Sequence, residues 1–395
     1  MRKLSANFIF PIAGKPLKNG ILIIGDSGEI LKIVDTNGEL YESEKLEFYN
    51  GVLVPGFVNT HCHLELSHLK NKITNDLGLT NFIDNIKKQR FAYNEEIHEA
   101  AKNADEMMQK EGIVAVGDIS NTSKSFPVKS NSKIHYHTFI EVFSFLEKQA
   151  DEVFQKAHNL YIAYQKNVNS SVSIVPHASY SVSEKLFSNI SEFALKNNSL
   201  ISIHNQECAG ENKMISDKTG DLYDYFIKCG FDLSEWKANG KNSINSSIRQ
   251  LPESVKKIYV HNTFTSKNDL DLVLNQKENI FFSICPNSNI YIENKLPNLP
   301  LFMKKNAQIT IGTDSLASNN SLSILEELKT INNFFPEISF MNLIKWATQN
   351  GALALNLEKS YGSFETGKTP GINLIQNFDF EKMNVSKKST VKVIV

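Results

Sequence analysis

The stretch GVLVPGFVNTHCHLELS, residues 51–67, places two histidines one residue apart, directly after an apolar run. The run at 51–58 is apolar throughout, as expected for a strand of a parallel sheet that is buried on both faces. Side chains alternate between the two faces of a strand, so His61 and His63 point the same way. Two imidazoles on one face of a strand end can bind the same metal ion.

Seven further apolar runs follow this one, and helical patterns such as residues 183–198 and 322–335 separate most of them. Strands that alternate with helical crossovers over roughly 300 residues predict an α/β fold, a (β/α)8 TIM-type barrel. The eight runs are residues 52–59, 113–120, 134–142, 172–179, 200–207, 258–262, 280–287 and 308–315.

Both ends of the chain read as strands outside this barrel. Residues 8–12, 21–24 and 30–34 are short apolar runs, and residues 372–380 and 390–395 are similar. Two or three strands cannot bury a core alone, so we expect the ends to combine. The sequence therefore predicts a small β-sandwich domain built from residues 1–51 and 358–395. The barrel, residues 52–357, is inserted between them as the catalytic domain.

Composition excludes several classes of protein. The net charge is −1 and 41% of residues are apolar, so we expect a small-molecule partner rather than nucleic acid. The N-terminus is a poor signal peptide, and no apolar run approaches a membrane span. We expect a cytoplasmic protein with reduced cysteines, because the four cysteines form no CxxC pair: Cys62, Cys208, Cys229 and Cys285.

Polar residues gather where the predicted strands end. The C-terminal ends of barrel strands carry the chemistry of this fold. Three imidazole nitrogens and one carboxylate suit Zn²⁺, or Fe²⁺ in a similar geometry, and a bound water then becomes acidic at neutral pH. The expected ligands are His61, His63, His204 and Asp314, and His177, Glu207 and His261 end neighbouring strands.

Other histidines and acids provide a comparison. His135 and His137 also form a His-x-His pair, but they begin a strand, so we expect a structural role at the opposite end of the barrel. Asp118 and Glu141 end strands, and we expect them to orient metal-binding histidines. Three histidines in helical or loop stretches are expected to have no special role: His68, His98 and His158.

Read in order, five segments resemble the amidohydrolase superfamily: PGFVNTHCH (55–63), SIHNQE (202–207), IYVHN (258–262), CPNSN (285–289) and GTDS (312–315). Residues 346–357 and 362–368 look like its closing signature. The His-x-x-Glu spacing of His204 and Glu207 is similar to the aminohydrolase branch, which contains deaminases and chlorohydrolase-like enzymes. HLELS (63–67) looks most like the aminodeoxyfutalosine deaminase-like group, and S-adenosylhomocysteine deaminases share the branch. Asn287 departs from the arginine of many relatives, which puts the substrate in doubt.

The resemblance implies a metal-dependent hydrolytic deaminase of a heterocycle with an N=C–NH₂ unit, such as the adenine-type nucleosides aminodeoxyfutalosine or S-adenosylhomocysteine. In the reaction that the resemblance implies, Asp314 would take a proton from the attacking water and His261 would orient that water. Glu207 would protonate the ring nitrogen and help ammonia leave, and His177 would contact the substrate. The run 172–179 lacks the lysine that bridges two metals in binuclear members, so one divalent ion is expected.

Further substrate contacts are predicted at Glu65, Arg90, Asn289 and Trp236. Residues 70–95 form a candidate substrate wall and residues 208–256 a candidate lid. Two alternatives stay open. One is a hydrolase that opens a ring amide, as imidazolonepropionase does, or displaces chloride. The other is a non-catalytic barrel scaffold, which is expected to lose its ligands. Members of the superfamily are often dimers, so a homodimer is one expectation.

Overall fold

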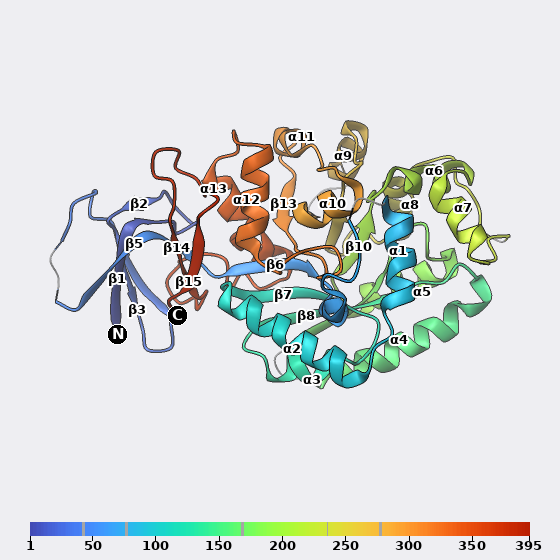
Figure 1. Cartoon of the computed structure of the whole chain (residues 1–395), viewed down its shortest axis with the longest axis horizontal. Coiled ribbons are helices and arrows are strands. Elements are labelled where there is room, and N and C mark those ends of the chain that lie inside the picture. Colours follow the sequence, from blue (N-terminus) through green and yellow to red (C-terminus); the bar gives the residue numbers. More distant parts are fainter. Residues whose placement is uncertain (42–43, 76–77, 167–169, 235, 276–278) are drawn as a thin grey trace.

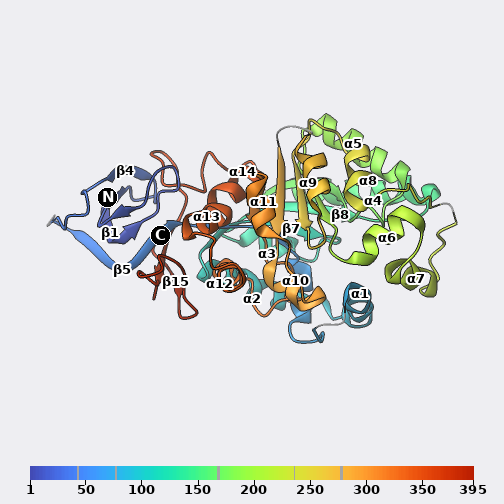
Figure 2. The same cartoon turned by 90° about the horizontal axis from the view of Figure 1, so that it is seen from above.

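The computed structural model describes residues 1–41, 44–75, 78–166, 170–234, 236–275 and 279–395. A small β-domain and a larger barrel lie side by side along the long axis of the molecule, and both chain termini belong to the small domain (Figure 1). Turning the molecule by 90° keeps this separation, with β4 (Ile30–Val34) and much of β5 (Leu46–Pro55) away from the barrel helices and β15 (Thr390–Val393) closer to them (Figure 2).

In the described part of the chain, eight parallel strands follow one another around the barrel and confirm the predicted fold class. They pair as two four-stranded sheets, in the orders β6-β7-β8-β9 and β10-β11-β12-β13. Their bounds are β6 Phe57–Cys62, β7 Ile113–Ser120, β8 His135–Val142, β9 Ser170–Pro176, β10 Ile201–Asn205, β11 Lys257–His261, β12 Ile280–Ile284 and β13 Gln308–Ile311.

Two seams join these half-barrels. A parallel bridge between Ala178 and His204 links the end of β9 to β10, and one between Cys62 and Asp314 links β6 to the end of β13. The chain thus closes at the strand ends where the polar residues gather. Side-chain hydrogen bonds reinforce the second seam, 2.7 Å between Asn59 Nδ2 and Thr313 Oγ1 and 2.8 Å between Thr60 Oγ1 and Thr310 Oγ1.

Helices cover the outer face of the parallel strands, and side chains of the strands themselves fill the inside of the barrel. Several begin at a side-chain cap, such as Ser183 or Ser266, which accepts a hydrogen bond from a free N–H of the first turn. Among the described residues, no helix has both the length and the apolar content to cross a membrane. The helices are α1 Gly78–Gln89, α2 Asn94–Lys110, α3 Phe126–Asn131, α4 Ala150–Gln165, α5 Glu184–Asn197, α6 Ala209–Asp217, α7 Asp221–Lys228, α8 Ser243–Gln250, α9 Lys267–Leu274, α10 Pro286–Glu293, α11 Leu299–Lys304, α12 Ile324–Phe334, α13 Phe340–Lys345 and α14 Gly351–Ala354, with short turns η1 Leu64–Leu69 and η2 Glu147–Gln149 and the π-helix η3 Trp346–Asn350.

The small domain combines both chain ends, as predicted. Its described strands form one seven-stranded sheet, in the order β15-β14-β5-β1-β3-β4 with β2 paired to β1. β5 passes straight into β6 through Gly56, where a Cβ would lie 2.3 Å from Val114 Cγ1, so only glycine fits. The predicted domain boundaries at 51/52 and 357/358 stay predictions. The remaining bounds are β1 Arg2–Ile9, β2 Leu17–Lys18, β3 Ile21–Ile24, β4 Ile30–Val34 and β14 Ile372–Gln376.

Candidate metal centre and active site

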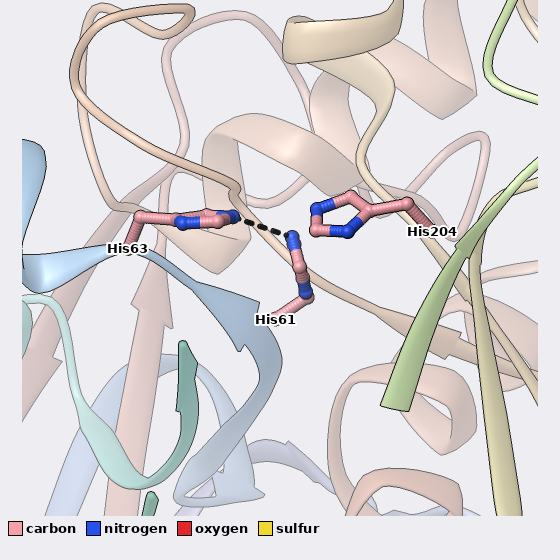
Figure 3. A group of neighbouring side chains, drawn as sticks. All are labelled: His61, His63 and His204. Atoms are coloured by element: carbon pink, nitrogen blue, oxygen red, sulfur yellow. Dashed lines mark hydrogen bonds between the residues drawn. The ribbon is translucent and has the colours of Figure 1, made fainter. Parts of the chain in front are cut away.

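The four residues predicted as metal ligands meet at the C-terminal ends of their strands. The rings of His61, His63 and His204 converge from β6 and β10 (Figure 3). Ligand atoms of these three histidines lie within 4.8 Å of one another, and those of His61, His261 and Asp314 form a second such group. Strands far apart in the sequence therefore bring nitrogen and oxygen donors to one point.

The distances fit one ion. His61 Nε2 and His63 Nε2 are 3.1 Å apart, and Asp314 Oδ1 lies 3.6 and 3.3 Å from them. Donor atoms that surround a tetrahedral ion at about 2.0–2.1 Å lie about 3.4 Å from each other. The donor set, imidazole nitrogen and carboxylate oxygen, is also one that zinc accepts.

A backbone carbonyl fixes the tautomer of His204. Its Nδ1 donates to His177 O at 3.0 Å, since a carbonyl oxygen can only accept. Nε2 of the neutral ring therefore keeps its lone pair for the ligand cluster. Glu141 Oε1 lies 3.3 Å from the same Nδ1, so its negative charge acts on the His204 ring from the end of β8.

Asn289 fixes the tautomer of His261 in the same way. Asn289 Nδ2 donates to His261 O at 3.3 Å, which turns its Oδ1 toward His261 Nδ1 at 2.9 Å. Nδ1 therefore carries the proton, and Nε2 is an acceptor that faces the site. Asn289 is 2% exposed and is not among the residues that line the cavity at the cluster, so its contact in this structure is to the histidine.

Protonation of the cluster follows from burial. Burial lowers the pKa of His61, His63 and His261 to about 4 each, so these rings are neutral at pH 7. Burial acts in the same direction on His204, but the hydrogen bond and charge of Glu141 outweigh it and raise the pKa of His204 to about 9. A metal ion that binds His204 Nε2 must displace the proton on this nitrogen, which the charge of Glu141 stabilises.

Two hydroxyls hold Asp314 in place. Ser288 Oγ and Ser318 Oγ donate to its Oδ2 at 2.7 and 2.6 Å, which leaves Oδ1 to face the histidines. Burial alone would raise the pKa of Asp314, but the neighbouring histidines hold it well below its ordinary value. Asp314 and His261 both adopt left-handed backbone conformations, φ 57° and 69°, which cost about 1–3 kcal/mol and are typical of active sites.

Glu207 faces the cluster from the loop after β10. Its Oε1 lies 3.6 Å from His261 Nε2, and Glu211 Oε2 accepts its backbone N–H at 3.0 Å. Burial, with the charges of Asp314 and Glu211, raises the pKa of Glu207 to about 8 against the opposing effect of His204. A carboxyl group that stays protonated at neutral pH is suited to act as a general acid.

One cavity opens onto this cluster. His177 lines it, with Nδ1 2.7 Å from Ser181 Oγ, and so does Arg90 at the end of α1. The inner wall is polar, whereas the outer wall is apolar and comes from α1, the loop after β8 and the region around α7. The apolar side chains are Leu66, Leu79, Phe82, Ile83, Ile86, Phe143, Phe145, Tyr180, Phe226 and Phe231.

The structure places three of the side chains singled out in the sequence away from their predicted contacts. Glu65 accepts hydrogen bonds from the backbone N–H groups of Asn121 and Thr122, so it holds a loop. Trp236 packs in an apolar cluster and lines a separate hollow. Asp118 contacts no histidine ring among the described residues, because its oxygens bind other groups. Residues 76–77 and 235 of the predicted wall and lid lie outside the described residues.

Sequence reasoning missed the supporting roles of Ser288, Ser318 and Asn289. Two of them lie in the CPNSN segment and the third lies just after GTDS. Their position as small polar residues next to strand ends was the feature of the sequence that could have indicated these supporting roles. His137, in contrast, is buried at the other end of β8 with Nε2 2.9 Å from Ser173 Oγ, where a structural role was expected.

A model of the amidohydrolase family matches residues 52–395. An adenosine deaminase of Helicobacter pylori is 28% identical over 347 residues, 85% of this chain and 81% of the relative. A 5-methylthioadenosine/S-adenosylhomocysteine deaminase of Thermodesulfovibrio yellowstonii is 25% identical over 386 residues, 91% and 81% of the two chains. The crystal structure of Helicobacter pylori aminofutalosine deaminase with methylthio-coformycin superposes with a TM-score of 0.82 at 24% identity, covering 97% and 94%. With the family model spanning the barrel and its strand-end cluster, the chain belongs to the amidohydrolase family.

Proposed function

We propose that this protein is a metal-dependent deaminase that hydrolyses an N=C–NH₂ unit of an adenine-type nucleoside, such as aminodeoxyfutalosine or S-adenosylhomocysteine. Its family and its relatives make it a hydrolase of carbon–nitrogen bonds. The observation that carries the proposal is the position of the buried Glu207, whose Oε1 lies 3.6 Å from His261 Nε2, beside the histidine–aspartate cluster. That pairing supplies an acid for the ring nitrogen and a base for water in one cavity.

The residues suited to hold one Zn²⁺ are His61, His63, His204 and Asp314. Their spacing, the neutral rings of His61 and His63, and the Nδ1–H hydrogen bond that turns His204 Nε2 toward the cluster support the assignment. Fe²⁺ accepts a similar donor set, but zinc is the commoner ion for nitrogen-rich sites. When bound, the ion supplies Lewis-acid chemistry that makes water a nucleophile at neutral pH.

The protein's own residues move the protons. Asp314 Oδ1 accepts a proton from the attacking water, while His261 Nε2 accepts a hydrogen bond that orients it. Glu207 donates its proton to the ring nitrogen, so the neighbouring carbon becomes electrophilic. A carbon–oxygen bond forms and the exocyclic carbon–nitrogen bond breaks. Glu207, now ionised, takes the remaining proton of the added water and gives it to the amine, which leaves as ammonia. The proton held by Asp314 then restores the acid form of Glu207. His177, half-buried in the wall, contacts the ribose or the ring.

The outer wall supports a nucleoside with an apolar substituent. α1 and α7 lie side by side in both views (Figures 1 and 2), and Lys87 Nζ lies 4.9 Å from the ring centre of Phe231. A free base would leave these apolar side chains without a partner. The relatives named above act, by their names, on adenosine and on 5-methylthioadenosine or S-adenosylhomocysteine. Assembly as a homodimer is proposed from the family resemblance alone.

Ammonia release by the purified, zinc-loaded protein tests the proposal. The panel holds aminodeoxyfutalosine, S-adenosylhomocysteine, methylthioadenosine, adenosine, guanine and cytosine. We expect release from at least one adenine nucleoside and none from cytosine. Silence across the panel with zinc bound would favour a ring amide or chloride as the bond that is cleaved. A protein that folds but binds no metal would favour the non-catalytic scaffold.

Asn289→Ala is expected to lower kcat by about 10-fold, because His261 loses the partner that fixes its tautomer. Asn289→Asp keeps an oxygen opposite Nδ1 but loses the Nδ2 donor to His261 O, so we expect a kcat between those of Asn289→Ala and the wild type. Steady-state kinetics on the best nucleoside, with zinc content and thermal midpoint measured in parallel, check this. An unchanged kcat in Asn289→Ala would show that His261 needs no such support.

A further inference from the structure

A buried ion pair lies outside the cavity, between α3 and the end of β7. Lys129 Nζ is 2.5 Å from Asp118 Oδ2, and both side chains are fully buried. The same nitrogen donates to Ser120 Oγ at 2.8 Å and to Thr138 Oγ1 at 3.2 Å. The three N–H groups of the ammonium therefore meet three oxygens, and the pair is fixed in one geometry.

The other oxygen of Asp118 reaches the metal-binding strand. Asp118 Oδ1 accepts the backbone N–H of Leu64 at 2.7 Å, and Leu64 directly follows His63. His63 is the N-cap of η1, and its side chain makes no capping hydrogen bond. Asp118 takes over that function from a neighbouring strand, because a free N–H at the start of a helical turn needs an acceptor.

The next residue, Glu65, is bound to the loop that directly follows β7. Glu65 accepts hydrogen bonds from Asn121 N at 3.1 Å, Thr122 N at 3.0 Å and Thr122 Oγ1 at 2.8 Å. Two successive residues after His63 are therefore held by β7 and the loop that follows it, Leu64 through its backbone N–H and Glu65 through its side chain. This arrangement leaves the peptide between His63 and Leu64 little freedom to rotate.

We propose that Asp118 and Lys129 are a positioning pair that fixes the peptide after His63 and thereby aims the His63 imidazole at the metal site. The inference rests on the metal site proposed above. Lys129 holds Asp118 in one rotamer through Oδ2, Asp118 holds Leu64 N through Oδ1, and His63 Nε2 then lies among His61 and Asp314. Displacement of this nitrogen weakens ion binding, since partners behind a ligand typically contribute 10- to 100-fold in metal affinity.

If the pair had a purely structural role, its replacement would change the stability of the fold but not the affinity for zinc. A buried ion pair is often replaced by neutral groups at little cost in stability, whereas removal of one partner leaves an uncompensated charge. Stability and positioning can therefore be separated by neutral double variants. Asp118→Asn with Lys129→Met keeps an oxygen for Leu64 N–H, and the introduced amide nitrogen can donate to Ser120. Asp118→Leu with Lys129→Met removes both charges and the acceptor.

The experiment compares zinc affinity, by competition with a chelator, in these two double variants and the wild type. We expect Asp118→Asn/Lys129→Met to bind within about 3-fold of the wild type and Asp118→Leu/Lys129→Met to bind about 10- to 100-fold more weakly. Thermal midpoints without zinc show whether the folds are equally stable. Equal affinities in the two double variants would overturn the proposal.

A second pair of variants covers the case in which the leucine variant does not fold. Leu64→Pro and Leu64→Ala both lose the leucine side chain, but only proline removes the N–H, at a first helical position where proline is tolerated. We expect weaker zinc binding in Leu64→Pro than in Leu64→Ala, and equal binding would contradict the proposal. A wild type that binds no zinc would overturn the metal site itself, which separates the two failures.

Discussion

Asp314→Asn is expected to lower kcat for the nucleoside substrate by about 10³-fold or more. Asparagine keeps the shape of the side chain but loses the negative charge beside His61 and His63 and the ability to accept a proton from water. Steady-state kinetics measure the loss, and metal analysis after dialysis shows how much zinc the variant retains.

Ser318→Ala is the matched control for this variant. It removes one of the two hydroxyls on Asp314 Oδ2 and leaves the carboxylate and Ser288 in place. We expect a loss of no more than about 10- to 100-fold, in line with one hydrogen bond to a charged group. An Asp314→Asn protein that keeps a tenth of the wild-type kcat would show that another group accepts the proton.

Glu207→Gln is expected to lower kcat by about 10²- to 10⁴-fold with little change in KM. Glutamine fills the same space beside His261 but is a far weaker acid than the protonated carboxyl that burial favours here. Glu211 still holds the backbone at residue 207, so the loop is expected to keep its shape. Single-turnover rates on an adenine nucleoside measure the chemical step directly.

Glu207 is proposed to protonate the ring nitrogen and to give a proton to the departing amine. A substrate with a different leaving group separates these two roles. A 6-chloropurine nucleoside needs a proton on the ring nitrogen, but chloride leaves without one. The loss caused by Glu207→Gln should therefore be smaller for the chloro compound than for the amine. Equal losses for both would restrict Glu207 to protonation of the ring, and no loss for either would exclude it as the acid.

The parts of the site that follow from local rules were predictable from the sequence. The alternation of side chains along a strand places His61 and His63 on one face, and the common edge of parallel strands brings His204 and Asp314 to them. The barrel and the composite β-domain followed from the order of apolar runs. These rules depend on neighbours in sequence or on a shared strand direction.

The supporting contacts depend on how distant elements approach and were not predictable. Asn289 lies on α10, and only the packing of that helix against β11 shows that its amide faces His261. Asp118 was expected to orient a histidine ring, but its oxygens are already taken by Lys129 and Leu64 N. Trp236 looked like a substrate contact because aromatic residues suit both lids and cores.

The seams between the half-barrels give the candidate metal centre a mechanical consequence. His61 and His63 belong to the β6–β9 sheet, whereas His204 and Asp314 belong to the β10–β13 half, and the bridges at both seams involve this end of the strands. An ion held by all four residues is a cross-link between two halves of the chain. Ion release and the parting of the halves are then one coupled equilibrium, since a ligand that binds only the closed form stabilises that form. The metal ion that would activate water would therefore also stabilise the closed arrangement of the two four-stranded sheets.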